Sequence, residues 1–168
     1  FGGEAKQALV LFDGMRAVEP FDNSVTWHLY PGEYLEYVQV RPGGGSTVYG
    51  EGAFSGVIDL QTKNPTQETR LTAEAVGGSF NTQKYFAEAS GTHEKLGVYV
   101  GSRYLTTDGY RVNSDHESAS TLLKTRYPLG DLLRVQNSFY FADNETGIPG
   151  PLTRAEMDVD RRQQDPDG

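Results

Sequence analysis

Five segments of the chain alternate between apolar and polar residues, and this period of two constrains the fold more than any other feature. The segments are Arg70–Val76, Thr82–Gly91, Leu96–Tyr104, Ser118–Tyr127 and Leu133–Phe141. A period of two sends successive side chains to opposite faces of a β-strand, so the pattern predicts strands. Each segment has about ten residues, the length that a tilted strand needs to cross a bilayer.

The alternation predicts two chemically different faces for the resulting sheet. The apolar face is predicted to carry Leu71, Leu96, Val98, Val100, Leu133 and Val135. The opposite face is predicted to carry the charged side chains of Glu88, Arg103, Lys124 and Arg134. The pattern weakens where two large residues are adjacent, at Tyr85-Phe86 and Leu122-Leu123. One face toward lipid and the other toward water is typical of outer-membrane barrel strands.

The connections between these segments differ in length in a regular way. From the second connection onward, the short "THEK" and "PLGD" alternate with the long "TTDGYRVNSDHES" and the final 27-residue segment from Ala142. In an antiparallel sheet, this places the long connections at one end, as in outer-membrane barrels. Aromatic residues near the strand ends fit an interfacial girdle: Tyr104, Tyr127, Phe139, Tyr140 and Phe141. Within the last connection, Thr153-Arg154-Ala155-Glu156 matches a capping box and predicts a short helix.

Composition narrows the function classes. A net charge of −8 and a pI near 4.8 argue against a nucleic-acid partner, which requires a basic face. The absence of cysteine excludes disulfides and thiolate metal sites. His28, His93 and His116 lie in separate segments without ligand spacing, so no metal site, cofactor or catalytic group is predicted. No apolar run approaches the roughly 18–20 residues of a membrane helix.

The first third of the chain differs from the rest. It offers three strand candidates, Ala8–Phe12, Tyr34–Val40 and Gly56–Lys63, with a hairpin turn signal at Asp13-Gly14. Composition shifts in the polar segment 64–69, so we predict domains at 1–65 and 66–168. The start at Phe1 and the polar final residues lead us to expect an internal segment of a longer protein.

The glycine-rich run 41–56 raises the alternative of a phosphate-binding loop. A P-loop requires Gly-Lys-Ser/Thr, and no lysine lies between Lys6 and Lys63. A dinucleotide fingerprint requires a third glycine and a following helix, whereas this chain has Ser55 and then a strand pattern. A nucleotide-dependent enzyme is therefore disfavoured.

The same run resembles the end of the plug domain of TonB-dependent outer-membrane receptors. The family pattern is a Val-Glu-Val strand, Arg-Gly-Pro, a small-residue turn, Tyr-Gly-x-Gly-Ala and Gly-Val-Ile-Asn-Ile-x-Thr-Lys. The chain matches it with "VQVRPG", "YGEGAF" and "GVIDLQTK", and "LVLFDGMR" is similar to an upstream plug strand and turn. Downstream, "DGYRVNSD" and "TGIPGPLTRAEM" resemble long external loops of such receptors. The chain departs from the pattern at Gln39, Pro42-Gly43, Ser55 and Asp59.

The resemblance implies a mainly β fold: a plug portion with a small mixed sheet, then antiparallel strands of an incomplete transmembrane β-barrel. It implies that Arg41 holds the plug against barrel carboxylates; an exposed strand-end arginine is the alternative. Glu19, Phe21, Asp22 and Glu51 are candidates for plug apices that contact substrate, with a solvated loop as the alternative. Gly50, Gly52 and Gly56 correspond to the glycines of the plug motif.

The function that the resemblance implies is active transport across the bacterial outer membrane, energised through TonB. The implied partners are TonB, outer-membrane lipid and a small solute, with a ferric siderophore or a similarly scarce nutrient as the expected substrate. No covalent chemistry is required. The alternative is a soluble β-sandwich module that binds carbohydrate, which would need protein on both faces of the sheet.

Overall fold

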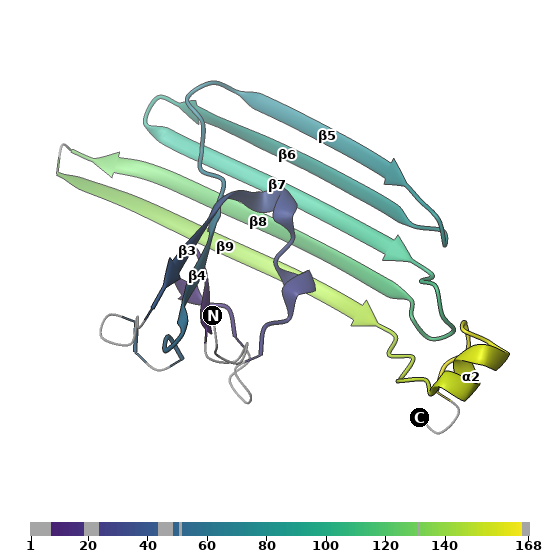
Figure 1. Cartoon of the computed structure of the whole chain (residues 1–168). Helices are drawn as coiled ribbons and strands as arrows, with labels where there is room; N and C mark the ends of the chain where they lie inside the picture. Colours follow the sequence, from purple (N-terminus) through teal and green to yellow (C-terminus); the bar gives the residue numbers. More distant parts are fainter. Residues whose placement is uncertain (1–7, 19–23, 44–48, 51, 131, 166–168) are drawn as a thin grey trace. The chain divides into compact units, whose positions relative to one another are not determined.

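A computed structural model describes residues 8–18, 24–43, 49–50, 52–130 and 132–165. The chain divides into two compact units, Phe1–Asn64 and Pro65–Gly168, and each is described by itself (Figure 1). Within the described ranges, no helix is long and apolar enough to cross a membrane.

The first unit contains a small mixed sheet. Its strands are β1 (Ala8–Phe12), β2 (Met15–Arg16), β3 (Leu35–Pro42) and β4 (Gly56–Thr62), in the order β2-β1-β4-β3. Two short 3-10 helices, Trp27–Leu29 and Gly32–Tyr34, precede β3. β1 pairs with β4 in parallel, while β3 pairs with β4 antiparallel.

The predicted turn at Asp13-Gly14 forms a two-residue hairpin between β1 and β2. Both residues have positive φ, 50° and 81°, as a type I′ turn requires. The Asp13 carboxylate accepts hydrogen bonds from the Thr62 amide at 2.9 Å and the Thr62 hydroxyl at 2.7 Å. The turn is thereby fastened to the end of β4.

The core of this unit lies between β1 and β4. It consists of Leu9, Leu11, Ala53 and Val57, each at most 4% exposed, with Tyr49 packed against them. β1, with the sequence ALVLF, is an apolar run in which four of five residues are buried, as suits an interior strand of the sheet.

The second unit is an antiparallel sheet with sequential order β5-β6-β7-β8-β9. The strands are β5 (Arg70–Gly77), β6 (Gln83–His93), β7 (Leu96–Thr107), β8 (His116–Leu129) and β9 (Leu133–Thr146). All five predicted strands are present, and β5 and β9 form the edges of an open sheet in the described part of the chain. β8 and β9 are longer than predicted because their polar ends also pair, as far as His116 with Thr146.

The register confirms the predicted faces of this sheet. One row of directly opposed residues runs across the five strands: Leu71, Ala89, Val100, Leu123 and Phe139. The adjacent row, on the other face, is Thr72, Glu88, Gly101, Leu122 and Tyr140. The four charged residues that were predicted for one face all lie on the same face as this second row. In the apolar row, Leu71, Val100, Leu123 and Phe139 are exposed.

The two places where alternation weakened have a simple explanation. Tyr85 and Leu123 lie on the exposed apolar face, at 50% and 38% exposed. Their neighbours Phe86 and Leu122 point to the other face and are buried. A large apolar residue on each face removes the sequence contrast without changing the strand.

Candidate functional site

The glycine-rich turn joins the end of β3 to the start of β4. Pro42 pairs with Gly56 there, and a Cβ on Gly56 would lie 2.7 Å from the Arg41 carbonyl oxygen. The φ of Gly56 is +148°, a conformation that side chains rarely adopt. Gly56 therefore allows the antiparallel pairing to continue to the first residue of β4.

Gly50 and Gly52 also have positive φ, +75° and +89°. The four predicted apex residues, Glu19, Phe21, Asp22 and Glu51, lie outside the described residues. Their substrate contacts remain predictions.

Arg41 lies on β3 and is exposed, and its guanidinium is held by neutral partners. Nη1 donates to the Tyr49 hydroxyl and Nη2 donates to Gln39 Oε1 at 2.7 Å. The guanidinium also lies over the Tyr49 ring, 5.7 Å from its centroid. On the other side, Arg16 Nη2 donates to the Tyr49 carbonyl oxygen at 3.2 Å. Tyr49 thus links two arginines, a contact that the sequence analysis did not anticipate.

A second cluster, which we call the loop platform, is formed by residues 78–82, 108–115 and 147–165. These connections share one end of the second sheet, because alternate turns of an antiparallel sheet emerge on the same side (Figure 1). The short connections 94–95 and 130–132 lie at the opposite end. The predicted segregation of long and short connections is therefore present.

Phe80 joins the first two parts of the platform. Its carbonyl oxygen accepts a hydrogen bond from the Asp108 amide at 2.9 Å. Its ring contacts Tyr110 edge-on, with centroids 5.6 Å apart. Arg162 then joins the third part, because its guanidinium lies 5.9 Å from the Tyr110 ring centroid and its Nε donates to the Tyr110 carbonyl oxygen.

Arg111 fastens the last connection to the platform. Its Nε donates to the Gln163 carbonyl oxygen at 2.9 Å, Nη1 to that of Gly150 at 2.7 Å and Nη2 to that of Pro149 at 3.1 Å. Three main-chain carbonyls from two separate stretches of the connection are thus bound by one planar side chain. "DGYR" had been recognised as part of a loop, but main-chain carbonyls carry no residue signal that would have identified this role.

The predicted helix begins after Thr153, as α2 (Arg154–Val159), and its capping box is present. The Thr153 hydroxyl accepts from the Glu156 amide, and Glu156 Oε2 accepts from the Thr153 amide at 2.6 Å. Hydrogen bonds from the Thr153 side chain and then its main chain hold the pKa of Glu156 below the usual range for a glutamate.

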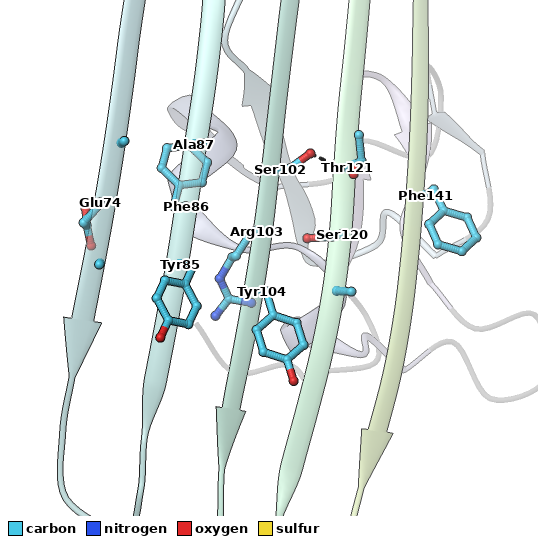
Figure 2. Close-up of a pocket in the computed structure, with 13 residues that line it drawn as sticks. Glu74, Tyr85, Phe86, Ala87, Ser102, Arg103, Tyr104, Ser120, Thr121 and Phe141 are labelled. Carbon is cyan, nitrogen blue, oxygen red and sulfur yellow. Dashed lines mark hydrogen bonds between the residues drawn. The ribbon is translucent and has the colours of Figure 1, made fainter.

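A shallow apolar groove of about 670 Å³ lies on the exposed face of the second sheet (Figure 2). Small residues form its floor, and larger aromatic residues project beside them: Ala73, Ala87, Ser102 and Thr121, then Tyr85, Tyr104 and Phe141. Tyr85 and Tyr104 are directly opposed on neighbouring strands, and Tyr104 donates a hydrogen bond to Glu117 at 3.0 Å. No group of three metal-ligating side chains occurs among the residues that the structure describes.

The chain is similar to known proteins in both sequence and fold. Residues 1–57 match the family model described as the TonB-dependent receptor plug domain. The vitamin B12 transporter BtuB of Vibrio cholerae serotype O1 is 29% identical over 114 residues, which are 66% of this chain and 18% of that protein. The chain therefore spans under a fifth of the length of this curated relative.

Solved structures share the fold. The copper transporter OprC matches with a TM-score of 0.72 and 15% identity, over 85% of this chain and 24% of that one. The ferric-catecholate import receptor Fiu from E. coli K12 matches with a TM-score of 0.69 and 21% identity, over 84% of this chain and 21% of that one. The family match thus covers residues 1–57, about a third of the chain, and the solved structures share the fold of the two sheets. The matched plug sequence is followed by the five-stranded antiparallel sheet β5-β6-β7-β8-β9.

Proposed function

We propose that this chain is part of an outer-membrane receptor that imports a scarce nutrient with energy supplied through TonB. Residues 1–65 are the C-terminal part of its plug, and residues 66–168 contribute the first strands of its barrel. The observation that carries the proposal is the inverted polarity of the second sheet. Its exposed face is apolar, with Leu71 at 78% and Phe139 at 65%, whereas the charged residues Glu88, Arg103 and Lys124 lie on the other face.

Strand length supports a membrane location for this sheet. β7 has 12 residues and β8 and β9 have 14 each. Fourteen residues at about 3.3 Å each extend about 46 Å, or about 33 Å along the normal at a 45° tilt. This is close to the roughly 30 Å hydrocarbon core of a bilayer. The aromatic pair Tyr85 and Tyr104, each with a hydroxyl that forms a hydrogen bond, suits an interfacial girdle.

The expected substrate is a ferric siderophore or a comparable scarce nutrient. The similar proteins named above are a vitamin B12 transporter, a copper transporter and a ferric-catecholate import receptor. The proposed energy-coupling partner is TonB, and the proposed surroundings of the barrel strands are outer-membrane lipid. Transport of this kind needs binding and release of a solute rather than a covalent step, so no catalytic residue is proposed.

The soluble carbohydrate-binding sandwich is disfavoured by the same apolar face. A sandwich buries one face of each sheet against the other and exposes a polar face. Here the face that is exposed is the one with leucine, valine and aromatic side chains. A contiguous apolar surface of this kind marks a protein or membrane contact rather than a face toward water.

Cysteine labelling in the full-length receptor tests the proposed orientation. The loop platform should face outward, so cysteines at Asn113 and Glu145 should react with an impermeant maleimide on intact cells. A cysteine at Gly130, at the other end of the sheet, should react only after the outer membrane is breached. Labelling of the Gly130 position alone would reverse the topology and refute the assignment. Uptake of candidate nutrients by cells with and without TonB then tests the energy source.

A further inference from the structure

The loop platform contains a cleft of about 580 Å³ that the family assignment does not explain. Its walls come from the connection 108–115 on one side and from α2 and its flanking residues on the other. Apolar atoms of Tyr110, Leu152 and Met157 form part of the lining. The remaining lining residues are charged: Arg111, Arg154, Asp158 and Arg161.

The charge of this cleft is opposite to that of the chain. The whole sequence has a net charge of −8, yet three arginines and one aspartate line the cleft. Like charges that line one cleft repel each other, and a bound anion would offset this repulsion. The local charge therefore indicates a negatively charged ligand.

The three arginines have different tasks. Arg111 uses Nε, Nη1 and Nη2 to bind main-chain carbonyls and so builds the cleft wall. Arg154 and Arg161 are exposed, and neither forms a hydrogen bond or ion pair with any residue that the structure describes. Their guanidinium forks, each with several N–H donors, match the two oxygens of a carboxylate or the oxygens of a phosphate.

The aromatic wall of the cleft is held in place before any ligand arrives. Tyr110 is fixed by the edge-on contact with Phe80 and by the Arg162 guanidinium over its ring. The Val112 amide donates to the Arg162 carbonyl oxygen at 2.7 Å, which ties the two walls together. A ligand that binds here loses little free energy to ordering of the platform.

We propose that this cleft binds an anionic group, a carboxylate or phosphate, on an organic ligand whose apolar part rests against Tyr110 and Met157. Arg154 and Arg161 bind the anionic oxygens. The inference depends on the proposed function only for the outward position of the platform, because the charge and shape of the cleft come from the second unit alone. The same chemistry is offered by a dissolved carboxylate or phosphate and by a lipid phosphate headgroup.

Calorimetric titration of the full-length receptor in detergent tests the site. The probes are tricarballylate, inorganic phosphate and dihexanoyl phosphatidic acid below its micelle concentration. Tricarballylate carries three carboxylates without the hydroxyl that strengthens metal chelation. The test variant is R154Q/R161Q. The matched control is R70Q/R134Q, which removes the same charge from exposed arginines at the other end of the sheet.

At low ionic strength, wild type and control should bind at least one probe saturably. R154Q/R161Q should bind it roughly tenfold more weakly or worse, as expected for lost hydrogen bonds to charged groups. Added salt should weaken binding to wild type. Preference for phosphatidic acid would assign the site to a lipid headgroup, and preference for the other probes would assign it to a dissolved anion.

The absence of saturable binding to all three probes would overturn the proposal, and so would equal weakening by both double variants. M157E, which adds a carboxylate beside the arginines, provides a second test if R154Q/R161Q does not fold. It should also weaken binding, and unchanged affinity would count against the site. If the wild-type receptor binds the probes but cells show no TonB-dependent uptake, the proposed function is refuted and the anion site still stands.

Discussion

Arg111 is predicted to hold the loop platform together, and its replacement should release the last connection without unfolding the sheet. Arg111→Met keeps most of the apolar stem and removes all three hydrogen bonds to the carbonyl oxygens of Pro149, Gly150 and Gln163. A hydrogen bond to a charged group contributes about 1.5–3 kcal/mol. The three share one half-buried side chain, and water can replace part of each, so we expect a loss of about 2–3 kcal/mol in total.

This loss should appear as faster local opening. A change of about 2–3 kcal/mol corresponds to roughly a 30- to 150-fold increase in amide exchange when opening is the limiting equilibrium. The reporter amides are Val112, Gly147 and Asp165, which donate to main-chain carbonyls across the platform at 2.6–2.8 Å. Hydrogen-exchange mass spectrometry on the full-length receptor measures all three.

Arg161→Met is the matched control, because it removes an arginine of the loop platform that forms no hydrogen bond with the described residues. The control should leave the three reporter amides at wild-type rates. Wild-type exchange in the Arg111→Met receptor would refute the reasoning. Equal acceleration in the β7–β8 ladder would also refute it, since it would mean that the whole unit had been destabilised.

Three further changes test other parts of the structure. Gly56→Ala should destabilise the first unit by about 1–3 kcal/mol, because Gly56 has a positive φ and lies close to the Arg41 carbonyl oxygen. Gly32→Ala, which has open space around it, should leave thermal or protease unfolding nearly unchanged. Ala73→Arg, on the apolar face, should make the free energy of barrel folding into membranes less favourable by about 2–4 kcal/mol. Thr72→Arg, one residue away on the other face, should be tolerated. Similar heat-modifiable gel mobility for both variants would contradict the lipid-facing assignment. Because hydrogen bonds lower the pKa of Glu156 in the folded chain, the capping box should stabilise α2 above the unfolded-state pKa and lose this effect as pH falls through the folded-state pKa. Exchange of α2 amides, corrected for intrinsic rates, should show this pH dependence in wild type and not in Glu156→Gln.

The strands of the second sheet could be predicted because apolar and polar residues alternate along them, which assigns each residue to one face. Leu71, Val100 and Phe139 alternate with polar neighbours, and a period of two fixes their common face once the strands pair. The ends of β8 and β9 could not be predicted, because polar residues such as Glu117 and Asn144 occupy both faces of the strands there, so the apolar–polar alternation is lost. Backbone pairing continued where the side-chain signal stopped.

The contacts of the arginines were less predictable than their positions. Arg41 was selected from a family motif, but neither residue type nor spacing indicated that Tyr49 would be its partner. Arg111 binds main-chain oxygens, which every residue possesses. The capping box at Thr153 was the exception, since both partners lie within one turn and are specified by residue type. The roles predicted for Arg41 and for Glu19, Phe21, Asp22 and Glu51 stay predictions.

The platform separates the residues that maintain its shape from those available for binding. Its shape depends on main-chain hydrogen bonds, on Arg111 and on the contacts of Tyr110 with Phe80 and Arg162. Arg154 and Arg161 contribute nothing to these contacts, although they line the cleft. Substitutions at these two positions can therefore change which ligand is bound without altering the supporting structure.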